Sequence, residues 1–198
     1  MLTGNTWRKV ILALAIISLN GCSLVPHNSS NKNARTALTE GDYPRAVSAL
    51  KAGKDEEALS LFNAVTRSYP DLAAAYINIG LIEIKKDHLH TAETALLHAA
   101  ALAPEQPETY NGLGIIYRRL GRFNDSESAY LKALRFAPDY ANAHLNLGIL
   151  YEIYLNDLSA ALPHYERYQA ISSGSNDLVN KWIIDVKQRL ARNMGAAK

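Results

Sequence analysis

The chain has 198 residues and a mass of 21.8 kDa, and 48% of its residues are hydrophobic, which is enough for one domain with a sizeable core. Lys and Arg number 21 against 19 for Asp and Glu, and loss of the first 21 residues would remove Arg8 and Lys9 and leave a formally neutral protein. This balance excludes strong electrostatic steering toward nucleic acid or an anionic membrane surface.

The N-terminus has the pattern of a targeting segment. Arg8 and Lys9 precede an apolar run from Val10 to Leu19, which is shorter than the roughly 20 residues that span a bilayer. The run ends in Leu-Asn-Gly before Cys22, the only cysteine of the chain. These residues resemble a bacterial lipoprotein signal, which implies cleavage after residue 21 and lipidation of Cys22. The alternative is an ordinary signal peptide followed by an incidental cysteine.

Residues 22–38 are predicted to form a flexible tether. The segment from Ser23 to Asn33 is rich in Ser and Asn and has neither a helical nor a strand period. Ser23, directly after the cysteine, resembles the lipoproteins that Gram-negative bacteria sort to the outer membrane. We therefore expect an outer-membrane lipoprotein that faces the periplasm.

The segment 39–173 repeats itself every 34 residues. Four residue classes recur in one phase, namely Pro70, Pro104 and Pro138; Gly80, Gly114 and Gly148; Tyr76, Tyr110 and His144; and Ala92, Ser126 and Ala160. A period of 34 is typical of a helix–turn–helix unit that stacks into a solenoid. A glycine inside a helix costs about 1 kcal/mol relative to alanine, so its recurrence predicts a close helix contact. The small residue 12 positions later is the predicted partner.

These residues resemble the tetratricopeptide repeat. Residues 107–140 carry the motif most fully, with Tyr110, Leu113, Gly114, Tyr117, Tyr130, Ala133 and Pro138. The resemblance implies an all-α right-handed superhelix of about four helix pairs, 39–72, 73–106, 107–140 and 141–173. It implies an architecture and not a chemistry.

Two repeats depart from the pattern, and a further helix follows the array. The first repeat carries Gly41 and Pro44, so its first helix is expected to begin near Tyr43. In the fourth repeat the pattern slips by one residue after Tyr151, which predicts a one-residue insertion between Tyr154 and Asp157. Within 174–198, an amphipathic helix from Asp177 to Arg192 is predicted to cap the array; the alternative is that it docks on a partner. Its apolar face comprises Leu178, Trp182, Ile183, Val186 and Leu190.

Few residues favour catalysis, and no cofactor or metal site is expected. Ser48 and Lys51 match the serine–lysine spacing of penicillin-binding enzymes, but the companion motifs of that class are missing. His88 and His90 are expected at an exposed turn, without a set of metal ligands around them. His98 and His144 occupy helical repeat positions and are expected to be packed.

The remaining expectation is a binding surface. The resemblance implies that the first helices of the repeats line a concave groove, which binds a protein or peptide segment. Carried over, the groove residues are Asn78, Leu81 and Lys85 in the second repeat, Asn111, Ile115, Arg118 and Arg119 in the third, and Asn142, Asn146 and Ile149 in the fourth. Asparagine amides can pair with an extended peptide, and the aliphatic residues, which are 34 apart, would form an apolar stripe. The alternative for the aliphatic residues is ordinary helix packing.

Together these features predict a non-catalytic, lipid-anchored adaptor for an envelope protein. The resemblance extends to small tetratricopeptide lipoproteins of pilus and secretin assembly. An adaptor for peptidoglycan enzymes is a second possibility of the same kind. A hydrolase that uses Ser48 and Lys51 is the alternative from another class.

Overall fold

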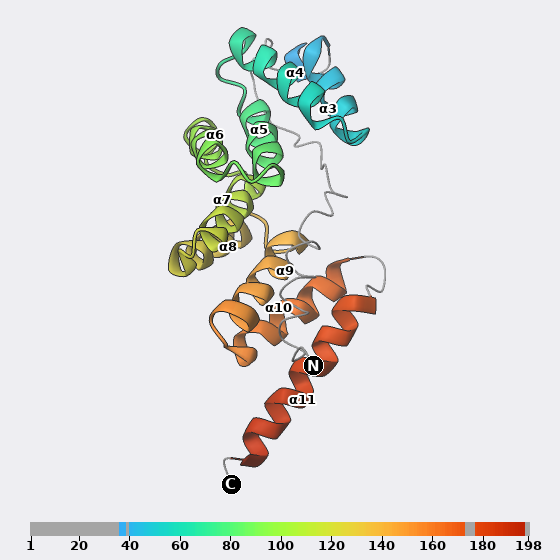
Figure 1. The fold of residues 1–198 in the computed structure, drawn as a ribbon, viewed down its shortest axis with the longest axis vertical. Coiled ribbons are helices and arrows are strands. Elements are labelled where there is room, and N and C mark those ends of the chain that lie inside the picture. The colour runs from blue at the N-terminus through green and yellow to red at the C-terminus, as the bar shows by residue number, and fades with distance from the viewer. Residues whose placement is uncertain (1–35, 39, 173–176, 197–198) are drawn as a thin grey trace. The chain divides into compact units, whose positions relative to one another are not determined.

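The computed structural model describes residues 36–38, 40–172 and 177–196 (Figure 1). Every regular element in these ranges is helical, in agreement with the all-α prediction. In chain order the elements are α3 (Asp42–Lys51), α4 (Asp55–Ser68), α5 (Ala73–Lys85), α6 (Leu89–Leu102), α7 (Pro107–Arg119), α8 (Phe123–Phe136), α9 (Ala141–Ile149), the π-helix η1 (Leu150–Tyr154), α10 (Leu158–Ile171) and α11 (Asp177–Ala196). The predicted signal peptide, the lipidation residue Cys22 and nearly all of the predicted tether lie outside the described residues.

The described residues form two compact units, 36–116 and 117–196, and the division falls inside α7. In the first unit α3 packs against α4, α4 against α5, and α5 against α6. In the second unit α8 packs against α9, α9 against α10, and α10 against α11. These contacts join helices that are neighbours in the sequence, as expected of a stacked repeat.

The first helices of the first three repeats end in the same way. Gly53, Asp87 and Gly121 are 34 residues apart and have left-handed backbones, with φ values of 72°, 65° and 75°. The amide of Gly53 donates to Leu50 O at 3.0 Å, and the next amide donates five residues back, at 2.9 Å. This is the Schellman arrangement, which satisfies the last carbonyl groups and reverses the chain. Glycine adopts this φ without strain, and it occupies two of the three positions.

The fourth repeat accommodates one additional residue, as the sequence predicts, but not in the turn. Its equivalent left-handed residue is Asn156, with φ 53°, which is displaced by one from the 34-residue spacing. The turn-closing bond from Asp157 N to Tyr151 O, 2.8 Å long, spans six residues instead of five. A π-turn holds an extra residue within a helix, so η1 absorbs the insertion before the turn begins.

The repeated glycines allow close helix contact, although their main partner is not the predicted one. A Cβ on Gly80 would lie 2.5 Å from Leu96 Cγ and 3.4 Å from the backbone oxygen of Ala92. A Cβ on Gly148 would lie 2.7 Å from Tyr165 Cε1. The large side chain of the second helix therefore occupies the space beside each glycine. Beside Gly80, the small residue Ala92 contributes its backbone oxygen.

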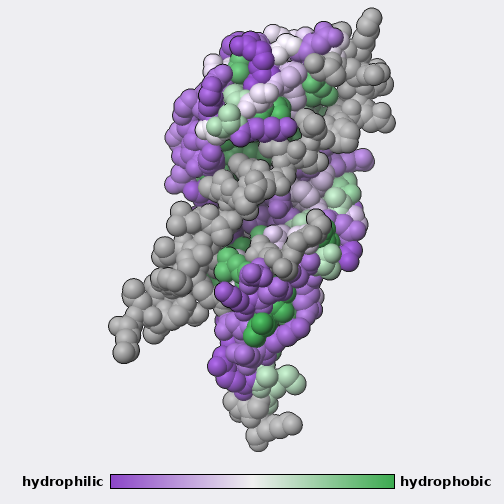
Figure 2. Space-filling model, turned by 90° about the vertical axis from the view of Figure 1, so that its right-hand side faces the viewer, coloured by the Kyte–Doolittle hydropathy of each residue, from purple (hydrophilic) through white to green (hydrophobic). Residues whose placement is uncertain are grey.

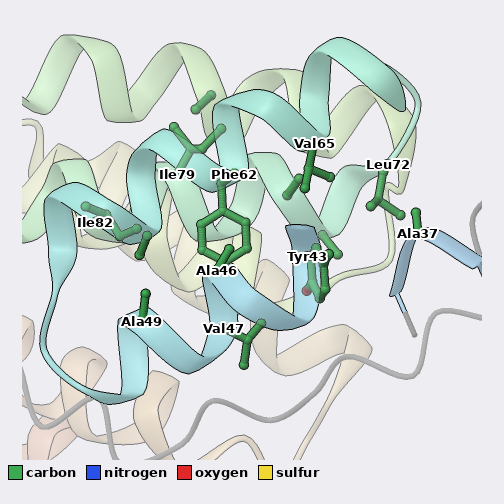
Figure 3. Close-up of a cluster of buried hydrophobic side chains, with 14 residues drawn as sticks. Ala37, Tyr43, Ala46, Val47, Ala49, Phe62, Val65, Leu72, Ile79 and Ile82 are labelled. Carbon is green, nitrogen blue, oxygen red and sulfur yellow. The ribbon is translucent and has the colours of Figure 1, made fainter. Parts of the chain in front are cut away.

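The hydrophobic core of the first unit is centred on Phe62 of α4 (Figure 3). Phe62 is fully buried, and its ring meets the ring of Tyr43 from α3 edge to face, with centroids 5.5 Å apart. Ile79 and Ile82 reach the same cluster from α5. Three successive helices thus bury one aromatic side chain, which explains why the irregular first repeat still stacks on the second.

The C-terminal helix α11 covers the last helix pair. Val179, Trp182 and Val186 are buried against Ile149 and Tyr165. Leu178, which was predicted on this face, is 39% exposed, and Val179 takes its place. The other predicted residues of this face, Trp182, Ile183, Val186 and Leu190, all pack in the cluster.

Candidate partner-binding surface

In the first unit, several predicted groove residues are engaged within the protein. The Nδ2 group of Asn78 donates to Tyr43 Oη at 3.2 Å and to Ala74 O at 2.8 Å, so both of its N–H groups are used. Lys85 is exposed and forms an ion pair with Asp55 of α4. Leu81 of α5 is half-buried and lies near Gly112 of α7. A Cβ added at Gly112 would be 3.7 Å from Leu81 Cδ2.

The two predicted groove residues of α7 in the same unit are buried. Asn111 is 5% exposed and makes contacts within the protein, and Ile115 is 7% exposed. In this unit the accessible part of the predicted surface therefore consists of Lys85, with Asn78 and Leu81 partly exposed beside it.

In the second unit, α9 contributes more to the core than to an open surface. Ile149 is buried in the cluster of Tyr165, Trp182 and Val186, so ordinary helix packing is the correct interpretation for it. Asn146 is buried and makes contacts within the protein, whereas Asn142 is half-buried. The predicted apolar stripe of the fourth repeat is occupied by the capping helix.

The two arginines at the end of α7, Arg118 and Arg119, differ sharply in solvent exposure. Arg119 is exposed, but Arg118 is buried, with 2% of its surface accessible. No described residue accepts a hydrogen bond from the three guanidinium nitrogens of Arg118. The ring of Tyr154 lies over this guanidinium at 5.7 Å, a cation–π distance. Of the predicted set, Arg118 is the residue whose hydrogen-bonding capacity is left unused.

A second buried charge, Glu152 of η1, is fully paired. Its Oε1 accepts from Arg189 of α11 at 2.7 Å, and its Oε2 accepts from Tyr165 Oη at 2.9 Å. Arg189 also contacts Asp185 at 3.3 Å. This network joins η1, α10 and α11, and it holds the capping helix in place.

An imidazole pair links α9 and α10. His144 Nε2 lies 2.9 Å from Pro138 O, and the Nδ1 atoms of His144 and His164 are 3.0 Å apart. Because Nε2 must donate to the carbonyl, Nδ1 of a neutral His144 accepts from His164. Burial and the neighbouring imidazole of His144 lower the pKa of His164 to about 4. The predicted packing of His144 is confirmed, but its partner is not apparent from the sequence.

A cavity of about 550 Å³ opens between α4, α5 and α6 in the first unit. Tyr76 lines it and meets His98 edge to face, with centroids 4.4 Å apart. His98 is exposed, so the prediction that it is packed was wrong. Three polar residues of α6 line the cavity at every fourth position, namely His90, Thr94 and His98. This spacing is the sequence signal that indicates a shared helix face.

Ser48, the candidate nucleophile, is hydrogen-bonded within its own helix. Its hydroxyl donates to Pro44 O at 2.9 Å, four residues earlier in the same helix. His88 is exposed, as predicted, and its Nδ1 lies 2.7 Å from Glu83 Oε2. Within the described ranges, no group of three or more His, Cys, Asp and Glu residues could hold a metal ion. No described helix is both long and apolar enough to cross a bilayer.

Outside the grey residues, the face drawn in Figure 2 is mainly hydrophilic, with small separate hydrophobic areas. Exposed large hydrophobic residues are correspondingly scattered over several helices, among them Leu97, Leu131, Tyr154 and Ile184. Single exposed apolar residues are normal on protein surfaces. Outside the grey residues, this face therefore carries no single large apolar patch.

The paired helices, their left-handed turns and the glycine contacts define a helical-hairpin repeat protein. Two family models described as tetratricopeptide repeat match residues 43–107 and 105–173. The chain belongs to the tetratricopeptide repeat family, and its fold is a scaffold for protein–protein interaction. No curated protein sequence matches it.

Solved structures give the same fold at low sequence identity. A thermophilic tetratricopeptide protein of Thermus thermophilus aligns with a TM-score of 0.65 and 19% identity over 80% of this chain and 84% of that chain. MamA of Desulfovibrio magneticus aligns with a TM-score of 0.58 and 21% identity over 68% and 76% of the two chains. An O-GlcNAc transferase of Thermobaculum terrenum aligns with a TM-score of 0.63 and 22% identity over 71% of this chain but only 27% of its own.

Proposed function

We propose that this protein is a non-catalytic adaptor that binds a partner polypeptide on the first helices of its repeats. The observation that carries the proposal is the helix-pair fold itself, because tetratricopeptide repeats present side chains of one face to other proteins. The MamA neighbours share the same repeat fold. The hydroxyl of Ser48, the strongest catalytic candidate, is engaged by its own helix.

We further propose that the adaptor is held at the periplasmic face of the bacterial outer membrane by a lipid on Cys22. The basic and apolar leader that ends at the only cysteine supports this location. Pilus or secretin assembly is the envelope process that we favour, on the resemblance to small tetratricopeptide lipoproteins.

The test is site-specific photo-crosslinking in the native envelope, followed by identification of the captured protein. A photoreactive residue is placed at Arg119, which is exposed on a first helix, and in a matched variant at Leu131, which is 41% exposed on a second helix. We expect capture of one envelope protein from Arg119 and much less from Leu131. Equal capture from both positions, or none, would contradict binding on the first helices.

The identity of the captured protein tests the pathway. A secretin subunit or pilus-assembly protein supports the assembly role, whereas a peptidoglycan synthase or hydrolase would replace it with an adaptor role for those enzymes. A Cys22→Ala variant in the same experiment separates the anchor from the binding surface. Capture that persists from detergent-solubilised Cys22→Ala protein shows that binding does not need the lipid.

A further inference from the structure

Among the described residues of the second unit, Arg118 is a buried charge without a hydrogen-bond acceptor. Arg118 is 2% exposed, and its Nε, Nη1 and Nη2 atoms have no hydrogen-bond acceptor among the described residues. Glu152, another buried charge among the described residues of this unit, is paired as buried charges usually are. Arg189 and Tyr165 donate hydrogen bonds to its two carboxylate oxygens. A buried charge opposes folding unless it is paired and hydrogen-bonded. Arg118 is therefore retained at the expense of stability, and the described residues supply no acceptor for its guanidinium.

The surroundings of Arg118 are aromatic. Tyr154 covers the guanidinium at 5.7 Å. The ring of Phe123 packs against Tyr154, with centroids 5.1 Å apart. Tyr154 is 43% exposed, so part of its side chain faces solvent. The Arg118 guanidinium thus lies one side chain below the surface.

The Tyr130 hydroxyl is a second buried polar group near Arg118. Burial raises the pKa of this phenol, and the nearby side chains of Arg118 and Ser126 offset part of that rise. Tyr130 therefore keeps its proton and cannot neutralise the guanidinium. Arg122, the nearby cation in the sequence, is already stacked on Tyr117 at 4.2 Å and paired with Asp125 at 2.8 Å.

We propose that Arg118 is the anchor for a single carboxylate of the partner polypeptide, an Asp or Glu side chain that displaces the Tyr154 ring. This inference rests on the proposed partner-binding function and names the chemistry of its site. A guanidinium presents two parallel N–H groups that match a carboxylate. One carboxylate balances one guanidinium, whereas a phosphate dianion would leave a buried negative charge without a counterion.

The first test observes the arginine side chain directly. Full-length protein labelled with ¹⁵N arginine is titrated with sodium acetate and with N-acetyl-glutamate amide, against sodium chloride and N-acetyl-glutamine amide at equal ionic strength. The Nε–Hε resonance of Arg118, assigned by its loss in Arg118→Met, is expected to shift with the two carboxylates only. A single ion pair predicts half-saturation on the order of millimolar. No shift, or a larger shift with sodium phosphate than with acetate, overturns the proposal.

The second test separates a binding residue from a structural one. Arg118→Met keeps an unbranched side chain and removes the unpaired charge, and the matched control is Arg135→Met on α8, outside the buried set. We expect the urea midpoint of Arg118→Met to equal or exceed that of the unchanged protein, and acetate to raise the midpoint of the unchanged protein and of Arg135→Met only. A lower midpoint for Arg118→Met would show that the guanidinium supports the fold, and it would overturn the proposal.

The two proposals fail separately. Capture from Arg119 with no carboxylate response at Arg118 refutes the anchor and leaves the adaptor function intact. A carboxylate response without any captured envelope protein supports the anchor and refutes the adaptor function.

Discussion

Replacing Gly80 by alanine tests whether the repeated glycine is required by helix contact. The new Cβ would lie 2.5 Å from Leu96 Cγ and 2.7 Å from Leu96 Cδ2. Leu96 is fully buried, and it also packs closely against Gly112 of α7. A Cβ added at Gly112 would lie 2.6 Å from Leu96 Cδ1. The leucine is thus held between glycines of two successive first helices and has no free direction in which to move.

Two effects of opposite sign determine the magnitude. Alanine is favoured over glycine within a helix by about 1 kcal/mol, whereas overpacking a core costs roughly 1–3 kcal/mol. Since the contact involves the branch carbon of Leu96, we expect the upper part of that range and a net loss of about 1–2 kcal/mol. For a protein of this size the melting temperature would fall by roughly 2–8 °C.

Urea and thermal unfolding followed by circular dichroism measure the loss, and hydrogen exchange in α5 and α6 localises it. Gly112→Ala is the internal comparison, because it meets a terminal methyl of Leu96 and is expected to cost less. In the double variant Gly80→Ala with Leu96→Ala, the new methyl fills part of the cavity, so the two changes should cost less together than their sum. A Gly80→Ala protein that is as stable as the original would refute the close-contact explanation.

Three further outcomes follow from the buried contacts and the leader. Because the pKa of His164 is lowered to about 4 from its ordinary 6.5, the unfolded chain takes up this proton first as the pH falls. Stability is full above pH 6.5 and declines by about 1–2 kcal/mol toward pH 4, since solvent partly screens the half-buried imidazole. A flat profile in the original protein, or an unchanged slope in His164→Gln, would contradict this. Arg189→Met leaves Glu152 buried without its cation and should lower the free energy of unfolding by about 2–4 kcal/mol. Urea unfolding measures this loss, and hydrogen exchange should show reduced amide protection in α11. Intact protection would show that the ion pair does not hold the capping helix in place. Cys22→Ala should release the protein from membranes, and sedimentation with the membrane fraction in that variant would argue against a lipid anchor.

The sequence predicted the helix pairs because the signals for them are local and periodic. Apolar spacing, recurrent prolines and the glycine position all repeat every 34 residues, and each acts within one helix or one turn. The additional residue of the fourth repeat was also detectable, since it shifts the pattern of the second helix. Its location in η1 was not, because a π-turn and a longer loop displace the later residues equally.

The functional surface was less predictable, since it depends on contacts between side chains far apart in the sequence. Asn78 is bonded to Tyr43, 35 residues away, and Ile149 is covered by α11, so neither is left open as a groove residue. Both outcomes depend on the rotation of each helix about its axis, to which a repeat pattern is insensitive. The sequence by itself determined which segments are helices and how they pair. Only the tertiary structure decided which polar groups are satisfied internally and that Arg118 is buried without an acceptor, because hydrogen bonding requires partners placed within about 3 Å.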